Sequence, residues 1–171
     1  MGISIIINLL RFVLLVLIQV FFLKNTGYYN LATPHLYILF ILLLPFETPN
    51  FLLFTLSFIL GLTIDVFYDT LGLNAAACTV LALVRILYIS VTVQKQGFDN
   101  EPEPRLGLMG FRWFIFYAAI LTFFHHLVLI SFEVFRFSDV PYILLRVFLS
   151  SAFTIFLILV AEFIFFRKKV R

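Results

Sequence analysis

Charged residues are scarce in this chain. They make up 12% of its 171 residues, while 63% are hydrophobic. A soluble domain carries about 25% charged residues and needs a polar surface, so the composition excludes a soluble fold. The single cysteine, Cys78, excludes an intrachain disulfide, and a net charge of +3 is too small to suggest a nucleic-acid partner. The composition predicts an integral membrane protein with essentially no domain outside the bilayer.

The sequence also lacks recognisable catalytic and metal-binding motifs. It contains no G-x-S-x-G, no H-E-x-x-H and no phosphate-cradling loop. His125 and His126 are adjacent, so on a helix their side chains point about 100° apart and do not easily share one metal ion. Asp65 and Asp69, four residues apart, would repel each other on one helical face. We therefore expect no catalytic residue, no metal and no cofactor.

Long apolar runs are what the sequence does have, and they predict its fold. A helix of about 20 apolar residues crosses a hydrocarbon core about 30 Å thick. The first run, 3–23, is too long for a signal-peptide core and precedes no cleavage site, so we expect it to be retained. Pro45 and Pro49 bracket a turn, because neither continues a helix interior. The prediction is an all-α, polytopic membrane helix bundle in one domain, residues 1–171, with six spans: 3–23, 30–46, 50–67, 73–93, 113–132 and 142–166.

The second span is the weakest of the six, because it takes Pro34 into its first turn. The alternative is five spans plus a re-entrant second segment. The distribution of basic residues favours six, with both termini and the loop 94–112 in the cytoplasm. On that topology the external loops hold only Lys24 and Arg136. The cytoplasmic segments hold Lys95, Arg105, Arg112, Arg167, Lys168, Lys169 and Arg171.

Ionisable residues inside the spans sort into two predicted polar layers. An arginine at a helix centre costs about 2.5–3.5 kcal/mol on insertion scales, so each is expected to have a partner or a water-filled cavity. The inner cluster consists of Arg11, Arg85 and Glu162. The outer layer, interpreted as a polar pocket, consists of Asp65, Asn74, His125, His126, Glu133 and Arg146. The alternative for both layers is packing, with Arg11 and Arg85 reaching towards the headgroups.

The stretch from Gly61 to Ala77 is predicted to be a helix-packing hairpin between the third and fourth spans. Asp69 should lie at the wet boundary, whereas Asp65 lies deeper and needs a partner, with Arg146 the first candidate and His125 or His126 the second. The residues expected to pack the two helices and form the turn are Gly61, Gly72, Ala75, Ala76 and Ala77.

This stretch also carries a resemblance to a known family. The pattern G-L-x-x-D-x-F-x-x-T-x-G-x-x-A-A-A resembles the signature of the rod shape-determining protein MreD family, in the form seen in Bacteroidetes-like bacteria. The similarity extends to TPHLYILFILLLPFE, LALVRILYI, EPEPRLGLMGFRWFIFYAAIL and HHLVLISFEVF, and so covers nearly the whole chain. Two positions depart from the pattern: Ile86 stands where proline is expected, and Asn74 where histidine is common.

The resemblance implies a non-enzymatic protein of the bacterial inner membrane. Such proteins bind MreC and work with MreB, RodA and a class B penicillin-binding transpeptidase, so that peptidoglycan synthesis and cell shape are organised. The alternative is a small membrane receptor that binds a small molecule or a lipid intermediate in an outward-facing polar pocket, like the substrate-binding subunits of vitamin transporters. Against that assembly, the first span lacks the small-residue face with which those subunits dock their partner.

Overall fold

A computed structural model describes residues 2–27, 32–96, 103–134 and 140–164, and within these ranges the regular elements are all helices. Arg136, Arg167, Lys168, Lys169 and Arg171 lie outside the described residues. The elements are α1 (Gly2–Leu17), the π-helix η1 (Ile18–Leu23), the 3-10 helix η2 (Leu36–Ile38), α2 (Leu39–Leu42), α3 (Asn50–Tyr68), α4 (Leu73–Gln96), α5 (Leu106–Met109), α6 (Phe111–Val134) and α7 (Val140–Ile164).

In the described part of the chain, five helices are long and apolar enough to cross a membrane. They cover Ile6–Leu23, Asn50–Tyr68, Leu73–Val93, Phe111–Val134 and Val140–Ile164. These bounds lie within about three residues of five predicted spans, except that residues 165 and 166 fall outside the described part of the chain. The prediction of an all-α bundle is confirmed for the described residues, and five helices have the length and apolar composition of a multi-pass membrane protein.

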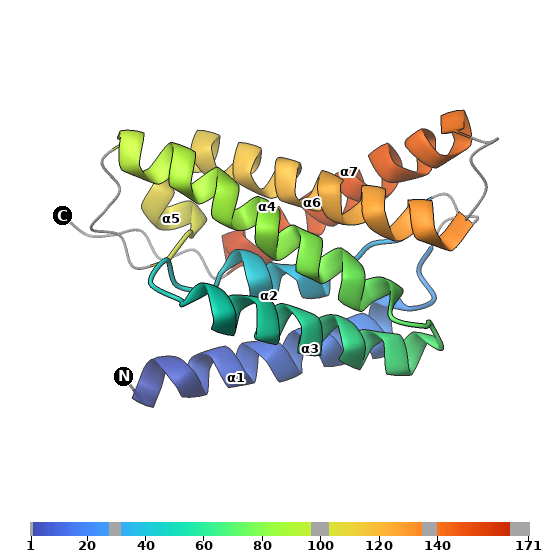
Figure 1. The fold of residues 1–171 in the computed structure, drawn as a ribbon, viewed down its shortest axis with the longest axis horizontal. Helices are drawn as coiled ribbons and strands as arrows, with labels where there is room; N and C mark the ends of the chain where they lie inside the picture. Colours follow the sequence, from blue (N-terminus) through green and yellow to red (C-terminus); the bar gives the residue numbers. More distant parts are fainter. Residues whose placement is uncertain (1, 28–31, 97–102, 135–139, 165–171) are drawn as a thin grey trace.

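The helices pack in chain order, α3 on α4, α4 on α6 and α6 on α7, with α1 lying along the α3 side (Figure 1). The bundle has two ends, called the loop end and the hairpin end. The loop end is where α1 begins, α4 and α7 end, and α5 lies. The hairpin end is where α3 passes into α4 and α6 ends (Figure 1).

The predicted second span, 30–46, is not a helix of spanning length. Only Leu36–Leu42 is helical, split between η2 and α2, and residues 28–31 lie outside the described part. Seven helical residues extend only about 11–14 Å, well short of the bilayer core. The segment is instead the most deeply buried of the fold, since every residue from Pro34 to Leu44 is buried. It runs through the bundle from the hairpin end towards the loop end (Figure 1).

The turn predicted from the two prolines is present. Thr48 donates from its backbone N–H and from its hydroxyl to the carbonyl of Pro45, and the hydroxyl bond is 2.7 Å long. Pro49 then precedes the first residue of α3 in an extended conformation, where its missing N–H removes no helical hydrogen bond. This turn lies at the loop end, and α3 carries the chain back to the hairpin end.

Candidate functional site

Asp65 holds the start of α4, rather than pairing with an arginine. It lies one turn before the end of α3 and is 3% exposed. Its Oδ1 accepts from the backbone N–H and the side-chain amide of Asn74, both at 3.0 Å, and from the hydroxyl of Thr70. Its Oδ2 accepts from the backbone N–H of Ala75 at 2.9 Å. The carboxylate thereby satisfies amides that the first turn of a helix leaves without intrahelical partners, where negative charge is also favoured by the helix dipole.

The α3–α4 contact next to Asp65 is close because Gly61 has no side chain. A Cβ at Gly61 would lie 2.5 Å from the Cα of Ala75, which is backbone that cannot move aside without separating the helices. Ala75 and Ala77 are buried, and Gly72 adopts a positive φ of 82° in the turn. Ala76 is exposed, so it does not belong to the packing face that the sequence suggested. Its neighbours face α3 or the core while it points away, as helical periodicity requires.

The predicted pairing of Asp65 with Arg146 is wrong. Arg146, at 4% exposed, donates from its Nη2 to Glu133 at 3.1 Å. This pair links α7 to α6, and the guanidinium also lies 5.9 Å from the centre of the Tyr142 ring. The Glu133 side chain is 44% exposed, so the pair lies at the edge of the bundle rather than at its centre.

Three histidines meet at the centre of the fold. His125 and His126 come from α6, and His35 comes from the irregular segment before η2. His126 Nδ1 lies 2.8 Å from the carbonyl of Thr122 and must donate to it. Its Nε2 is therefore an acceptor for His35 Nδ1, 3.2 Å away, and for the hydroxyl of Thr154, 3.3 Å away. All three rings are buried, at 0–6% exposed.

A chain of hydrogen bonds connects His125 to Asp65, and the ring of His125 lies against the rings of His35 and His126. The hydroxyl of Tyr37 donates to Asn74 Oδ1 at 2.8 Å and so accepts from His125 Nε2 at 3.0 Å. The amide nitrogen of Asn74 donates in turn to Asp65. Five of the six residues predicted to line the outer pocket are thus buried among protein partners. Four of them, Asp65, Asn74, His125 and His126, form a polar core with Tyr37 and His35, in which Asn74 joins the hairpin to His125. Arg146 bonds separately to Glu133 at the edge of the bundle.

Other polar side chains of the long helices bond to the backbone of the irregular segment. Gln19, in the π-helical turn η1, donates to the carbonyl of Pro34 at 3.0 Å. From α7, Ser150 accepts the backbone N–H of Thr33 at 3.1 Å, and Thr154 accepts that of His35 at 3.0 Å. Non-helical backbone at membrane depth is tolerated only where protein or water satisfies it. The polar side chains of the spans provide these bonds.

The predicted inner cluster forms only in part: Arg11 lies within electrostatic reach of Glu162, but the three side chains do not bond to one another. Arg11 donates to the carbonyl of Leu43 at 3.1 Å, and Arg85, at 2% exposed, donates to the carbonyls of Leu44 and Pro45. Both arginines therefore bond to the carbonyl end of the buried segment instead of to Glu162. A guanidinium has five donors in a fixed fork, which suits it to adjacent carbonyls that have no helical partner.

Glu162 bonds to the loop between α4 and α6. It accepts the backbone N–H of Leu106, the first residue of α5, at 3.1 Å. The acidic partner of Arg11 is Glu103, 3.6 Å away, which also pairs with Arg105 at 2.9 Å. The sequence interpretation missed Glu103 because it lies outside the spans, in the EPEPR stretch. These contacts hold residues 103–112, which belong to the predicted cytoplasmic loop, against the loop end of the bundle.

The chemistry available to this core is limited by its burial. Cys78 Sγ lies 3.9 Å from His125 Nε2, a thiol–imidazole contact of the kind that nucleophilic enzymes use, but both side chains are 0% exposed. Among the described residues, no group of three His, Cys, Asp or Glu side chains could hold a metal ion. Both ring nitrogens of His126, together with His35 Nδ1 and His125 Nε2, already bond to protein groups, whereas His125 Nδ1 is buried without a hydrogen-bond partner.

Comparisons of the chain with protein-family models, with characterised proteins and with solved structures give no match. The contacts of the polar core and the resemblance in the sequence are therefore the basis for assigning a function.

Proposed function

We propose that this chain is a non-enzymatic component of a bacterial cell-elongation complex, of the type that the MreD family provides. In this role it lies in the inner membrane and binds the single membrane span of MreC. Through MreC it helps to organise peptidoglycan synthesis by MreB, RodA and a class B penicillin-binding transpeptidase, and hence cell shape.

The main support for the proposal is that the residues of the family-like signature pack α3 against α4 and hold the start of α4. Gly61 and Ala75 bring the two helices together, and Asp65 bonds to Thr70, Asn74 and Ala75. A carboxylate bonded in this way is unavailable as a base, a nucleophile or a ligand. A signature used for packing suits a protein whose task is to present a stable membrane surface to partners.

A six-crossing topology, with both termini cytoplasmic, is part of this proposal. It takes the buried segment 32–49 as the second crossing, made without a continuous helix. The segment runs from the hairpin end to the loop end, so that α1 begins and α7 ends on the same side (Figure 1). Arg105 and Arg112 lie at that end, whereas Lys24 lies at the other, which agrees with a cytoplasmic loop end.

The face that we propose for MreC is the exposed side of α1. Only 17% of the spanning part of α1 is buried in the bundle, against 33–50% for the other four helices. Leu10 is 64% exposed and Leu14 is 51% exposed, one turn apart on this face. Helix association in lipid depends on van der Waals packing, for which the least covered helix offers the largest free surface.

Co-purification with the MreC of the same organism tests the proposal. We expect the two proteins to elute together after detergent extraction, and a cysteine at Leu10 or Leu14 to cross-link to a cysteine in the MreC span. A cysteine at Phe148 on α7, 61% exposed, is the matched control, and the natural Cys78 is 0% exposed and should not react. If MreC stays unbound, or if depletion of this chain leaves rod shape and MreC localisation intact, the proposal fails.

The alternative, a receptor with an outward-facing polar pocket, has less support. Asp65, Asn74, His125, His126 and Arg146 are each at most 4% exposed and bond to protein groups. A receptor for a polar ligand needs such groups to be directed towards an accessible space.

A further inference from the structure

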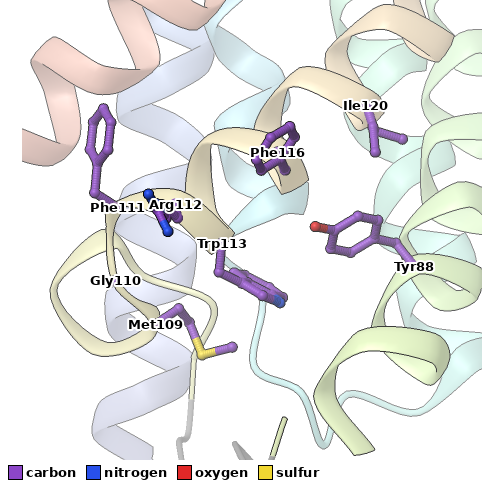
Figure 2. Close-up of a pocket in the computed structure, with 8 residues that line it drawn as sticks. All are labelled: Tyr88, Met109, Gly110, Phe111, Arg112, Trp113, Phe116 and Ile120. Atoms are coloured by element: carbon purple, nitrogen blue, oxygen red, sulfur yellow. The ribbon is translucent and has the colours of Figure 1, made fainter. Parts of the chain in front are cut away.

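A groove of about 700 Å³ lies between α4 and the start of α6, near the loop end of the bundle. It shares no residue with the polar core described above. Its volume is within the range of small-molecule sites, about 300–1,000 Å³. Figure 2 shows Tyr88 projecting from α4 across the groove towards α6. The lining residues are Tyr88, Met109, Gly110, Phe111, Arg112, Trp113, Phe116 and Ile120.

The floor of the groove is an aromatic stack. Trp113, 7% exposed, lies flat against Tyr117, with ring centres 4.8 Å apart and an angle of 19° between the planes. The ring of Tyr88 meets Trp113 edge-on at 5.7 Å. Tyr117 is itself fixed, since its hydroxyl donates to the carbonyl of Leu42 at 2.8 Å. The floor is therefore a largely apolar surface, held in place by ring packing and by the Tyr117 hydrogen bond.

The two ends of the groove differ in polarity. Its mouth, where α6 begins, carries Arg112, which is exposed and is the only charged residue of the lining. Further along α6, Phe116 is 64% exposed and Ile120 is 37% exposed, one turn apart on the same face. The first turn of α6 adds the positive end of a helix dipole at the mouth.

The length of the groove distinguishes between possible occupants. From Gly110 to Ile120 α6 rises about 15 Å, which is half of a hydrocarbon core about 30 Å thick. A partner's spanning helix would need a surface about twice as long. One leaflet's acyl chain, with its headgroup at the membrane interface, matches both the length and the change from charged to apolar lining.

We propose that this groove is a binding site for an anionic phospholipid of the leaflet at the loop end. Arg112 pairs with the phosphate and the anionic headgroup, and one acyl chain lies along Tyr88, Phe116 and Ile120 over the Trp113 floor. The site does not depend on the role in cell elongation, because it is built from residues that the proposed MreC face on α1 does not include.

Trp113 makes the site directly measurable, because it is the only tryptophan of the chain. The full-length protein is placed in phosphatidylcholine bilayers, and bromine-labelled phosphatidylglycerol or bromine-labelled phosphatidylcholine is added at matched fractions. Bromine quenches tryptophan fluorescence only at short range. We expect the apparent dissociation constant from Trp113 quenching to be about fivefold lower for phosphatidylglycerol than for phosphatidylcholine. One basic residue near an anionic surface contributes about 1 kcal/mol, which corresponds to about that factor.

Two variants separate the site from general charge attraction. Arg112→Gln should remove the roughly fivefold preference. Lys168→Gln removes the same charge from the C-terminal segment and should leave the preference unchanged. Equal quenching by the two lipids, or equal effects of the two variants, would overturn the proposal. Absence of quenching by either lipid would overturn it as well, because a protein segment or a second copy of the chain would then cover the groove.

Discussion

Replacing Asp65 by asparagine should destabilise the fold strongly, whereas the same change at Asp69 should not. The two residues are four positions apart and would be treated alike by any argument from composition. Asp65 is 3% exposed and bonds through both oxygens to the start of α4. Asp69 is exposed, ends α3 with a φ of 56°, and asparagine adopts that left-handed conformation readily.

The magnitude follows from the contacts that the substitution changes. Asparagine keeps one carbonyl oxygen for the donors around Oδ1, but its amino group then faces the backbone N–H of Ala75, 2.9 Å from the present Oδ2. A hydrogen bond to a charged group contributes about 1.5–3 kcal/mol, and a buried donor left without a partner costs about 1–3 kcal/mol. We expect Asp65→Asn to lower the free energy of unfolding by about 2–3 kcal/mol, roughly a 30- to 140-fold change in the unfolding equilibrium. Asp69→Asn should stay within about 0.5 kcal/mol.

The measurement is reversible unfolding in mixed micelles by increasing fractions of a denaturing detergent. Trp113 fluorescence reports the transition from the loop end, remote from the substitution. A double-mutant cycle then identifies the partner of Asp65. With Asn74→Ala the coupling energy should exceed about 1 kcal/mol, because the two side chains share a hydrogen bond. With Arg146→Gln the two changes should add within about 0.5 kcal/mol, because Arg146 pairs with Glu133.

Two results would refute this reasoning. One is a cost for Asp65→Asn no larger than that for Asp69→Asn, which would mean that the α4 amides do not depend on the carboxylate. The other is strong coupling of Asp65 to Arg146 together with additivity with Asn74, which would restore the pairing that opposite charge suggested.

Three further predictions use the same unfolding measurement. Ala75→Leu should lower the free energy of unfolding by at least about 2 kcal/mol, because Ala75 is 1% exposed and packs against Gly61. Ala76→Leu, at the exposed neighbouring position, should be nearly neutral. Equal costs for the two changes would contradict the close α3–α4 contact. Arg85→Gln should cost about 1–3 kcal/mol by leaving the buried carbonyl of Leu44 without its donor, whereas the carbonyl of Pro45 keeps its two bonds from Thr48. Lys24→Gln, at an exposed bond, should cost less than about 0.5 kcal/mol, and a neutral Arg85→Gln would show that water replaces the arginine. Tyr37→Phe should lower the free energy of unfolding by about 1–3 kcal/mol, because His125 and Asn74 both lose a buried partner. Tyr68→Phe, which removes a part-buried bond to Gln19, is the control and should cost less. A larger cost for Tyr68→Phe than for Tyr37→Phe would count against the hydrogen-bond chain.

The spanning helices could be predicted from the sequence because length and hydropathy decide them. The predicted span 50–67 and the observed α3, Asn50–Tyr68, differ by one residue, and Pro49 accounts for the start. Hydropathy also placed a span at 30–46, where the structure has a short broken helix. An apolar composition is what any segment buried in this bundle needs, so hydropathy alone does not distinguish a helix crossing lipid from irregular backbone inside protein.

The partners of the buried polar groups were harder to predict than their burial. Opposite charge suggested Arg146 for Asp65, but the unpaired amides at the start of α4 were the nearer partners. Counting the N–H groups that every helix start leaves without an intrahelical bond could have identified this cap. His35 was overlooked, although an ionisable residue after Pro34 in an apolar run is a signal in its own right. Its contact with His126, 91 positions away, depends on how the segment lies between α6 and α7. A long-range contact of this kind leaves no local pattern in the sequence.

The irregular second segment also constrains the order in which the protein is made. Its amide groups at Thr33 and His35 bond to Ser150 and Thr154, which follow 117 and 119 residues later. When the segment leaves the ribosome, α7 has not been synthesised, and unsatisfied backbone groups in lipid cost several kcal/mol each. The segment must therefore wait at the membrane interface, or be sheltered by the insertion machinery, until the last helix arrives. On the proposed six-crossing topology, the second crossing is then completed together with the final one, so a chain truncated before α7 should fail to insert it.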